Sequence, residues 1–535
     1  MVDTRYDTAF KLYPYERSPD QDQAIPAHHT AIVVGGGPVG MGMALDLGLR
    51  GVPVLVLDDH DGVGQGSRAI CFAKRTLEIC DRLGCGGPMV DKGVVWNVGK
   101  VFRDTKQIYE FNLLPEEGHR RPAFINLQQP YFEKFLVERV RRAIADGAPI
   151  EIRGRNAVTA IAEIDGGLRL DIDTPEGAYA LTSDWLIACD GARSPIRQMM
   201  GLGFAGRVFE DNFLIADVRM DAEFPTERWF WFDPPFNRGQ SALLHKQPDD
   251  IWRIDFQLGW DIDREKELDP SRIRARIDAM LGPDVAYELD WTSIYTFQCA
   301  TMDDYRHGRV FFAGDSAHQV SPFGARGCNG GMQDADNLGW KLAAVVAGDA
   351  TPALLDSYQT ERKFAADENI LNSSRATDFL TPKSPMSRVF RDAVLDLVEV
   401  APFARPLVNS GRLSVPAIYA TGAFVDDAAP MFPAATRPGA PMQDAPVNGG
   451  WLLDNFGSGF RILALNCAAD PVPHNRITAD VVPLTAPPQS ALAARYLADA
   501  PQGIYLIRPD QHIAGRWPDF DKAAITQALS ASLGA

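Results

Sequence analysis

The segment Ala31-Ile-Val-Val-Gly35-Gly-Gly37-Pro-Val-Gly40 opens a pattern of strand, glycine turn, helix and strand that closes at Asp58. The four residues before the turn are apolar and largely β-branched, which favours a buried strand. Residues 41–50 show a helical spacing of apolar side chains, and Val54-Leu-Val-Leu57 indicates a second buried strand. The sequence therefore predicts a βαβ unit near the N-terminus.

The glycines of this unit meet the physical requirements of a dinucleotide site. Gly35 allows a tight turn, Gly37 lets the backbone approach a pyrophosphate, and Gly40 lets the helix lie close to the strand. Asp58 follows Gly37 by 21 residues (58 − 37), against about 20 expected for the acid that binds a ribose hydroxyl. A purely structural glycine turn is the alternative. The predicted cofactor-binding residues of the unit are Gly35, Gly37, Pro38, Val39, Gly40, Asp58 and Asp59.

Composition narrows the class of protein. The 535 residues carry 53 basic and 70 acidic side chains, a formal charge of −17, which argues against nucleic acid or an anionic membrane as the main partner. No apolar run reaches the roughly 18 to 20 residues that span a bilayer, and the N-terminus lacks a signal-like apolar region. The seven cysteines include no CxxC pair, so we expect reduced thiols, no metal site and a cytoplasmic enzyme.

Two further strands are expected to end in an acid next to a glycine. Trp185–Cys189 precedes Asp190 and Gly191, and Arg309–Phe312 precedes Gly314 and Asp315. In α/β sheets such strand ends face the crevice where ligands bind. The glycine-rich stretch Gly327-Cys328-Asn329-Gly-Gly331 then begins a helix, whose free N–H groups favour a partial anion.

Two polar side chains lie beside these elements in sequence. Arg68, in a glycine-rich turn, is placed to reach a pyrophosphate, and a solvated loop arginine is an equal alternative. Gln129 precedes an amphipathic helix that starts at Pro130. Its side chain is either a ligand contact or an ordinary capping or surface amide. Residues 212–258 are rich in β-branched and aromatic residues separated by Pro and Gly, which predicts an antiparallel sheet.

Three stretches together resemble one family. They are Gly35–Gly40, Cys189-Asp-Gly-Ala-Arg-Ser-Pro-Ile-Arg197, and Arg309–Leu342 with Ala313-Gly-Asp-Ser-Ala-His318 and Asp334-Ala-Asp-Asn-Leu-Gly-Trp-Lys-Leu342. The sequence resembles the single-component FAD-dependent aromatic hydroxylases, which include 4-hydroxybenzoate and phenol hydroxylases, and most closely the 3-(3-hydroxyphenyl)propionate hydroxylases. The resemblance covers most of residues 30–375.

This resemblance implies roles for individual residues around FAD. Asp58 would bind the adenosine ribose, Arg68 and Gln129 the middle of FAD, and Asp315 the ribityl chain. The backbone at Gly327, Cys328 and Asn329 would meet the flavin, and Asp190 would serve FAD and NAD(P)H. The implied catalytic residues are Arg253, His245, Pro322 and Asp255, and the implied substrate pocket holds Trp231, His245, Gln247, Pro322 and Phe323.

Two of these assignments have plain structural alternatives. His245 is a candidate base for a phenolic substrate, and a core or hydrogen-bonded histidine is equally compatible with the sequence. Phe230, Trp231 and Phe232 are either apolar walls of the pocket or ordinary sheet core. His318 is expected to be structural.

The implied fold class is α/β, with a Rossmann-like FAD-binding domain, an inserted antiparallel substrate domain and a C-terminal thioredoxin-like domain. The expected order is an N-terminal extension (1–29), a discontinuous FAD-binding domain (30–204 and 296–375), a substrate domain (205–295, with strands from about 95–127), a helical and Pro-rich linker (376–450), and the thioredoxin-like domain (451–535). That last domain holds a single cysteine, Cys467, so it cannot run a dithiol cycle.

The implied function is a monooxygenase that uses NAD(P)H and O₂ to hydroxylate a phenolic or related small aromatic substrate through a C4a-hydroperoxyflavin. Because the chain has one dinucleotide fingerprint, NADPH or NADH is expected to dock transiently. An FAD-dependent dehydrogenase or oxidase and a non-catalytic FAD-binding redox sensor are the alternatives. A flavin halogenase is disfavoured because no Gly-Trp-x-Trp-x-Ile motif occurs. We expect a homodimer.

Overall fold

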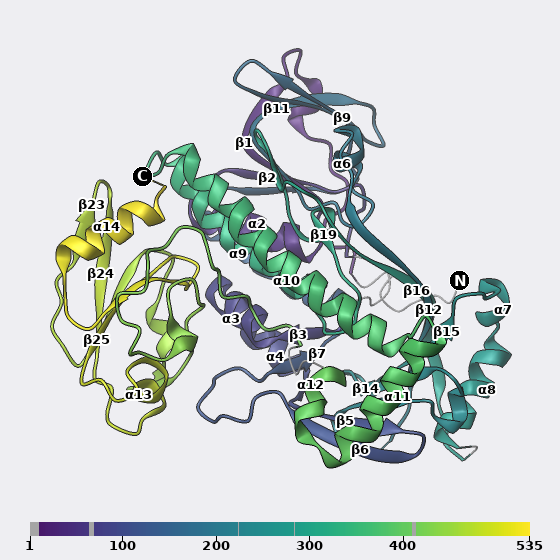
Figure 1. Ribbon diagram of the computed structural model, residues 1–535. Coiled ribbons are helices and arrows are strands. Elements are labelled where there is room, and N and C mark those ends of the chain that lie inside the picture. The colour runs from purple at the N-terminus through teal and green to yellow at the C-terminus, as the bar shows by residue number, and fades with distance from the viewer. Residues whose placement is uncertain (1–9, 64–68, 223, 283, 409–412, 535) are drawn as a thin grey trace.

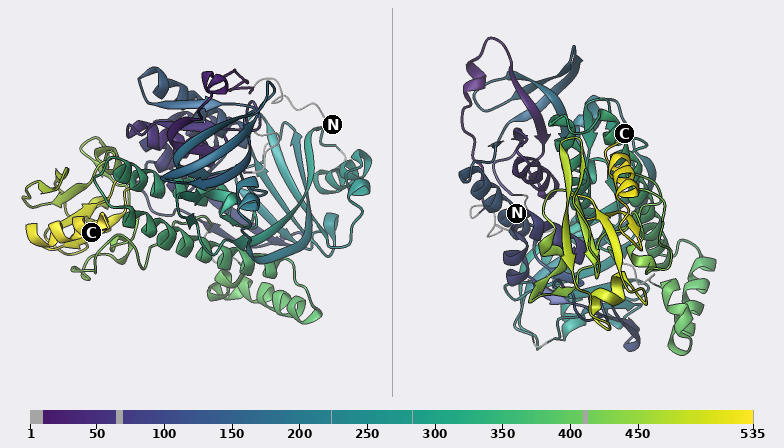
Figure 2. Two further views of the ribbon diagram at one scale, coloured as in Figure 1. Left: turned by 90° about the horizontal axis from the view of Figure 1, so that it is seen from above. Right: turned by 90° about the vertical axis from the view of Figure 1, so that its left-hand side faces the viewer.

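Long helices separate two large β-sheets, and a third, smaller sheet lies at the C-terminal side (Figure 1). The computed structural model describes residues 10–63, 69–222, 224–282, 284–408 and 413–534, and the statements below refer to these residues. Arg68, one of the residues expected to bind FAD, lies outside them. Figure 2 shows the C-terminal sheet at one end of the molecule and the second large sheet at the other.

The first sheet is built on parallel strands in the order β18-β11-β1-β2-β8. Their segments beside the glycine loops, such as Ala31–Val34, Val54–Leu57 and Val310–Phe312, are wholly apolar and buried, as expected for strands covered on both faces. Their bounds are β1 (Ala27–Val34), β2 (Val54–Leu57), β8 (Ile150–Arg153), β11 (Tyr179–Ala188) and β18 (Val310–Phe312); β17 (Arg306–His307), β9 (Ala157–Ile164) and β10 (Gly167–Asp173) extend the sheet antiparallel.

Helices cover this sheet and bring glycine loops to its strand ends. The helix expected after the glycine turn is α2 (Pro38–Leu49), and it packs against α5 (Gln129–Ala145) and α9 (Gly327–Val346). The predicted βαβ unit is therefore confirmed. The other helices here are α3 (Lys74–Leu83), α4 (Gly86–Lys92), α6 (Pro195–Met199) and α10 (Asp356–Leu380).

The second sheet has the strand order β19-β16-β12-β15-β14-β13-β5-β6. It is antiparallel except where β13 runs parallel to β5, which confirms the predicted antiparallel sheet in residues 212–258. Its strands are β5 (Val98–Arg103), β6 (Lys106–Asn112), β12 (Ala205–Arg219), β13 (Arg228–Phe232), β14 (Ser241–Lys246), β15 (Ile251–Gly259), β16 (Glu288–Thr301) and β19 (His318–Gln319).

The two faces of this sheet have different neighbours. One face packs against α8 (Pro270–Leu281), which follows the short α7 (Arg264–Glu267), through a cluster that includes Ile254 and Ile273. The other face, called here the inner face, carries Arg228, His245 and Arg253. Because side chains alternate along a strand, neighbouring residues of β13 point to opposite faces.

A small sheet of β3 (Cys71–Ala73), β7 (Phe124–Asn126) and β4 (Val94–Trp96) lies between the two large sheets. It is joined to the second sheet by the Asn126 amide, which donates to the carbonyl of Lys246 at 2.7 Å. Residues 94–127 therefore supply strands to two sheets, and only β5 and β6 belong to the larger one.

The C-terminal sheet has the order β23-β24-β22-β25-β26, with β22 parallel to β24 and antiparallel to β25. Its core includes Trp340 of α9, so it packs directly on the helices of the first sheet. The bounds are β22 (Arg461–Leu465), β23 (Val472–His474), β24 (Ile477–Leu484), β25 (Gly503–Ile507) and β26 (Ile513–Trp517), with α13 (Ala491–Tyr496), α14 (Lys522–Ser532) and a small hairpin of β20 (Pro446–Val447) and β21 (Gly450–Trp451).

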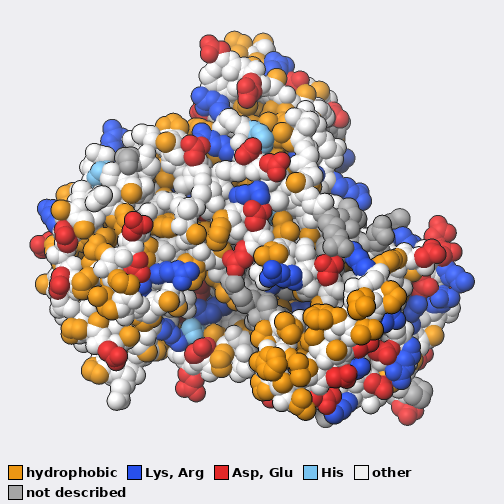
Figure 3. Space-filling model, in the orientation of Figure 1, with side chains coloured by type: hydrophobic (Ala, Val, Ile, Leu, Met, Phe, Trp, Pro, Cys, Tyr) orange, Lys and Arg blue, Asp and Glu red, His pale blue; other side chains and the backbone are white. Residues whose placement is uncertain are grey.

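The segment expected to be a linker contains α11 (Pro385–Val400) and α12 (Arg405–Val408), followed by irregular chain. That irregular chain is packed rather than loose, because Tyr419, Ala423 and Phe432 are buried. On the outer side of α11 and α12, apolar side chains gather at the surface (Figure 3), among them Val400 and Phe403. Within the described ranges, no helix combines the length and apolarity needed to cross a membrane.

Candidate active site

The glycine turn after β1 is held so tightly that side chains are excluded from it. Gly35 has a φ of +106°, and a Cβ there would lie 2.4 Å from the carbonyl oxygen of Cys189. A Cβ on Gly40 would lie 1.9 Å from the carbonyl oxygen of Gly35. Gly37, by contrast, has open space where its side chain would be. The turn therefore presents bare backbone toward an open region at the start of α2, as a pyrophosphate site requires.

The second glycine-rich loop meets the first one at Val39. A Cβ on Gly314 would lie 3.0 Å from Cγ2 of Val39, and one on Gly331 would lie 2.5 Å from the same atom. Gly314 follows β18, and Gly331 lies in the first turn of α9. The start of α2, the loop after β18 and the start of α9 therefore converge on one place, although they are separated by almost 300 residues of sequence.

Asp58 closes β2 beside the glycine turn. Its carboxylate accepts hydrogen bonds from the backbone N–H of Gly36 and, at 2.7 Å, from that of His60. Burial raises the pKa of this carboxyl. The neighbouring Asp59 is exposed and contacts only His60 among the described side chains. Asp58 is thus positioned at the edge of the nucleotide region, and Asp59 points to solvent.

Asp190, at the end of β11, carries a buried oxygen without a partner. Its Oδ2 accepts from the backbone N–H of Ile196 at 3.0 Å, whereas Oδ1 has no hydrogen-bond partner among the described residues. Burial raises the pKa of this carboxyl as well. Asp315 lies exposed in the loop after β18, and a Cβ on Gly327 would be 3.7 Å from its Oδ1. Both acids therefore sit at strand ends beside the converging loops.

The start of α9 offers backbone rather than side chains to a ligand. The Asn329 amide oxygen accepts from Ala73 N–H at 2.8 Å and from Thr76 Oγ1 at 2.6 Å, and its nitrogen donates to the carbonyls of Cys71 and Ala325. Burial raises the pKa of the Cys328 thiol, so it is not a thiolate nucleophile at neutral pH. Asn329 thus fastens the helix terminus to β3 and α3.

Gln129 lies at the first turn of α5 and is engaged by protein groups. Its Oε1 accepts from the backbone N–H of Ala69 at 3.1 Å, and its Nε2 donates to Glu133 at 2.7 Å. The side chain therefore holds the end of the glycine-rich turn that begins at Gly62. His318 has a structural position, because its Nε2 lies 2.7 Å from the buried Asp334 carboxylate.

These residues fit FAD. The bare turn at Gly37, the unpartnered oxygen of Asp190 and the acid at Asp58 supply the groups that a dinucleotide needs in a single connected region. In addition, the first turn of α9 leaves free backbone N–H groups for the partial negative charge of a reduced flavin ring.

The inner face of the second sheet carries a row of charged residues on neighbouring strands. Arg253 pairs in register with Asp217 of β12 and with His245 of β14. Arg253 and Asp217 form a two-point ion pair, with both N–O distances 2.8 Å and both side chains buried. Arg253 is therefore locked to the sheet, and Gln247 donates to the same Asp217 at 3.1 Å.

His245 is buried and Asp255 is half-buried, and each has side-chain atoms that the fold leaves without a hydrogen bond. Neither ring nitrogen of His245, nor Oδ1 of Asp255, has a hydrogen-bond partner within the described ranges. Burial, reinforced by Arg228 and Arg253, holds the pKa of His245 well below its ordinary value. Burial also raises the pKa of Asp255 to about 6. Such perturbed groups gather where a site does proton chemistry.

A pocket opens between the second sheet, the loop before α9 and the end of α10. Its walls are mostly aromatic and aliphatic, and three cationic side chains, Lys100, Arg228 and Arg326, reach it. Its apolar lining residues are Val101, Tyr109, Phe111, Phe230, Phe232, Phe323, Ala376, Leu380, Val408 and Leu413. Phe323 is thus a pocket residue, and the exposed Pro322 precedes it in the same loop.

Trp231 does not belong to this pocket. It packs on the opposite face of the sheet, with its ring 5.1 Å from that of Phe102 and 5.7 Å from that of Phe236. The physical reason is strand alternation, which turns Phe230 and Phe232 toward the pocket and Trp231 away from it. His245 and Gln247 lie on the inner face but do not line this pocket.

Arg228 is a pocket residue that sequence reasoning missed. It shares the face of Phe230 and Phe232 by alternation along β13, and that pattern was the available signal. Its guanidinium lies 5.9 Å from the Trp96 ring, and Nη1 is buried with no hydrogen-bond partner in the part of the chain that the structure describes. Arg228 itself is half-buried, and a buried N–H group without an acceptor beside a pocket costs free energy unless a ligand supplies the acceptor.

Comparison with known proteins agrees with this site. A family profile described as "FAD binding domain" matches residues 28–373. The 12-dehydrotetracycline 5-monooxygenase/anhydrotetracycline 6-monooxygenase of Streptomyces rimosus is 30% identical over 381 residues, which are 70% of this chain and 74% of that protein. The 3-(3-hydroxy-phenyl)propionate/3-hydroxycinnamic acid hydroxylase of Escherichia coli (strain 55989 / EAEC) is 28% identical over 462 residues, which are 84% and 80% of the two chains.

Two of three solved structures share the fold over nearly the whole chain, and the third shares it over about three quarters. The flavin-dependent monooxygenase PieE, solved with FAD and substrate, superposes with a TM-score of 0.77 at 23% identity over 95% of this chain and 99% of its own. Aklavinone-11 hydroxylase, solved with FAD and aklavinone, gives 0.76 at 23% identity over 96% and 100%. The p-nitrophenol 4-monooxygenase PnpA of Pseudomonas putida DLL-E4 gives 0.64 at 26% identity over 72% and 97%.

The chain therefore belongs to the FAD binding domain family. Within it, this protein is a flavoenzyme of the FAD-dependent monooxygenase group, as the sequence motifs implied.

Proposed function

We propose that this protein hydroxylates a phenolic or related aromatic substrate, with NAD(P)H and O₂ as co-substrates. The observation that carries the proposal is the shared wall of the two sites. The aromatic pocket is lined by Phe323, Gly324 and Arg326, which lie in the loop that runs directly into the flavin-binding start of α9. A ring bound there lies beside the cofactor region.

The lining of the pocket supports a mainly apolar aromatic substrate that carries an anionic group. Aromatic walls favour a planar ring, and the unpaired Nη1 of Arg228 calls for an acceptor such as a carboxylate or phenolate. Lys100 is already paired with Glu227 at 2.7 Å, so Arg228 is the better anchor. The names of the relatives include both a polycyclic tetracycline and a hydroxyphenylpropionate. Of these two classes, the pocket favours an aromatic acid of the second kind.

Proton transfer in this proposal depends on Asp255 and His245. Bound FAD supplies the redox chemistry that activates oxygen, while protein groups orient the substrate and exclude water. Asp255 and His245 lie on the same face of the sheet as the pocket residues Arg228 and Phe230 but do not line the pocket, so the proposal includes a relay of the phenol proton to this pair. Asp255 gains a negative charge above pH about 6 and is the proposed acceptor, whereas the lowered pKa of His245 makes its neutral ring a weak one. Arg253, fixed by Asp217, holds a constant positive field over this pair.

Nicotinamide binding is proposed to be transient. The family fingerprint supports one permanent dinucleotide site, the one around Gly37, which FAD occupies. The unpartnered oxygen of Asp190 lies on the side of the converging loops. At this position it can accept a hydrogen bond from either FAD or the nicotinamide cofactor.

For the C-terminal residues we propose a thioredoxin-like fold without redox activity. The order β24-β22-β25-β26, with β22 parallel to β24 and β25–β26 an antiparallel hairpin followed by α14, supports this assignment. Cys467 is half-buried and lies 3.8 Å from the carbonyl of Gly503, and no second thiol is in that domain. All seven cysteines are free, in keeping with the proposed cytoplasmic location; we also propose a homodimer.

The test is a product analysis with isotopic oxygen. The purified yellow protein is mixed with NADPH or NADH under ¹⁸O₂ and a panel of hydroxyphenyl acids, neutral phenols and polycyclic phenols. We expect an aromatic acid to stimulate cofactor oxidation and to gain one ¹⁸O atom. An oxidised product without ¹⁸O would identify a dehydrogenase or oxidase, and bound FAD with no substrate-stimulated oxidation across the panel would favour a redox sensor.

A further inference from the structure

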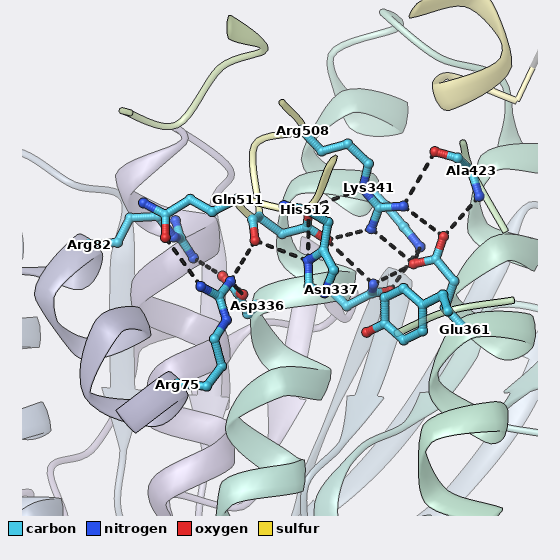
Figure 4. A network of polar contacts seen from close by, with 12 residues as sticks. Arg75, Arg82, Asp336, Asn337, Lys341, Glu361, Ala423, Arg508, Gln511 and His512 are labelled. Carbon is cyan, nitrogen blue, oxygen red and sulfur yellow. Dashed lines mark hydrogen bonds and ion pairs between the residues drawn. The ribbon is translucent and has the colours of Figure 1, made fainter. Parts of the chain in front are cut away.

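The turn between β25 and β26, residues 508–512, lies buried against the helices that carry the cofactor loops. Arg508, Asp510 and His512 are 1%, 0% and 5% exposed. Buried charges require partners, and here they come from helices of the first sheet (Figure 4). The turn makes three sets of contacts with different parts of the FAD site.

The first set joins the turn to α9 and α10. Arg508 donates two hydrogen bonds to the Glu361 carboxylate of α10, at 2.8 and 2.9 Å. Lys341 of α9 donates to the same carboxylate at 2.8 Å and to the Asn337 side chain at 2.8 Å. The long helix that begins at the flavin loop is therefore tied to the turn by charges that have no access to water.

The second set reaches the helix that begins at the pyrophosphate turn. The carbonyl of Asp510 accepts from Arg75 of α3 at 2.6 Å, and Arg75 pairs with Asp336 of α9 at 3.0 Å. Arg82 of α3 then joins Asp336 to Asp46 of α2, at 2.6 Å to each. Through this set the turn is connected to α2, whose first residues follow Gly37.

The third set leads to the loop that holds Asp315. The His512 ring stacks on Tyr419, with centroids 4.9 Å apart and planes 21° apart. The Tyr419 hydroxyl accepts from Arg362 at 2.9 Å, and Arg362 donates to Asp334 Oδ1 at 2.6 Å. The other oxygen of Asp334 accepts from the backbone N–H of Gly314 at 2.9 Å.

We propose that the 508–512 turn is a positioning element of the FAD site, which sets the place of the Gly314–Asp315 loop through Tyr419, Arg362 and Asp334. The physical reason is that every member of this path is buried and hydrogen-bonded. Because no water molecules can replace these hydrogen bonds, a movement of the 508–512 turn must move the side chains bonded to it. The C-terminal domain would thus act on FAD through the Gly314–Asp315 loop, and the proposal depends on FAD binding alone, not on the reaction catalysed.

The test removes one hydroxyl from the path and leaves the ring. In Tyr419→Phe, stacking on His512 is kept and Arg362 loses an acceptor. The matched control is Tyr496→Phe, because Tyr496 is also buried and its hydroxyl bonds the backbone of Gln443, which is not part of the path from His512 to Asp334. The measurements on full-length protein are the FAD dissociation constant, the visible circular dichroism and midpoint potential of bound flavin, and the melting temperature of the apoprotein.

We expect Tyr419→Phe to raise the FAD dissociation constant roughly three- to thirtyfold, the range typical of mutations along a coupled network, and to change the flavin dichroism and potential. Tyr496→Phe should lower the melting temperature of the apoprotein and leave the three flavin properties as in the wild type. Unchanged flavin properties in Tyr419→Phe, or equal changes in both variants, would overturn the proposal.

A second pair of variants tests the same path from the other end. His512→Phe keeps a ring on Tyr419, and His512→Ala removes it. FAD binding should stay near the wild-type value in His512→Phe and weaken in His512→Ala. Equal flavin affinity and dichroism in these two variants would contradict the proposal even if Tyr419→Phe fails to accumulate.

Discussion

His245 Nε2 lies 3.9 Å from Asp255 Oδ2, diagonally across the β14–β15 strand pair, on the inner face of the second sheet. Burial acts on the two pKa values in opposite directions: it raises that of Asp255 to about 6 and, together with Arg228 and Arg253, lowers that of His245. Both side chains are therefore held toward their neutral forms.

The first prediction concerns the pH dependence of turnover. If Asp255 must be ionised to accept a proton, kcat/KM for a phenolic substrate falls below pH about 6. Asp255→Asn should remove this ionisation from the pH–rate profile and lower the plateau about a hundredfold or more. His245→Ala should leave the ionisation near 6 in place. An unchanged profile in Asp255→Asn would exclude Asp255 as the base.

Stability should move in the opposite direction with pH. Because the folded-state pKa of Asp255 is raised, folding favours its protonated form, and its contribution to stability is lost as the pH rises from about 4 through about 6. The melting temperature of Asp255→Asn should therefore exceed that of the wild type by more at pH 8 than at pH 5. Thermal melts at the two pH values check this, and an equal difference at both contradicts it.

The second prediction concerns Arg228. Replacing it by Met removes the unpaired guanidinium, so the KM for an aromatic acid should rise by about tenfold or more, in line with the loss of a charge-assisted hydrogen bond. Arg228→Lys should retain part of the affinity. A neutral isostere of the acid serves as the control substrate, and an equal loss for acid and isostere would show that Arg228 is not an anion anchor.

The third prediction concerns the convergence of the two cofactor loops. In Gly331→Ala the new methyl group would lie 2.5 Å from Val39 Cγ2, so the loops must separate, at a cost of about 1–3 kcal/mol. FAD affinity should fall accordingly. Gly203→Ala is the control, since nothing lies within 4 Å of a Cβ there. Adding Val39→Ala to Gly331→Ala removes the closest contact and leaves the one at 3.1 Å to Gly314 Cα, so it should restore part of the binding, and a double variant no better than Gly331→Ala would contradict the packing argument.

The fourth prediction concerns Glu361. Its pKa is held far below the ordinary range because Arg508 and Lys341 outweigh the effect of burial. Glu361→Gln leaves those two cations buried without their carboxylate and should destabilise the protein by about 3–5 kcal/mol. Asp480→Asn, which breaks the exposed pair with Arg461, should cost about 0–1 kcal/mol. Urea unfolding measures both, and similar values for the two variants would refute the assigned importance of the network.

The sequence alone determined the cofactor half of this protein. The Gly35–Asp58 pattern is local, because a strand, a turn and a helix N-terminus within 28 residues already specify where a phosphate binds. The strand ends at Asp190 and Asp315 were predictable for the same reason, since each is an apolar run that leads within a few residues to an acid next to a glycine. The inner-face position of Arg228 was present in the alternation of β13, although Phe230, Trp231 and Phe232 were named together from the sequence and Arg228 was left out.

Only the tertiary structure decided the rest, because unpaired charges and buried contacts depend on residues far apart in the chain. Whether Arg228, His245 and Asp255 have partners follows from how three strands and a small sheet pack, and no spacing in the sequence states it. Trp231 lies on the opposite face of the sheet from Phe230 and Phe232, which places it outside the pocket. Arg508 reaches Glu361 across 147 residues, so the link between the C-terminal domain and the FAD loops exists only once both have folded against each other.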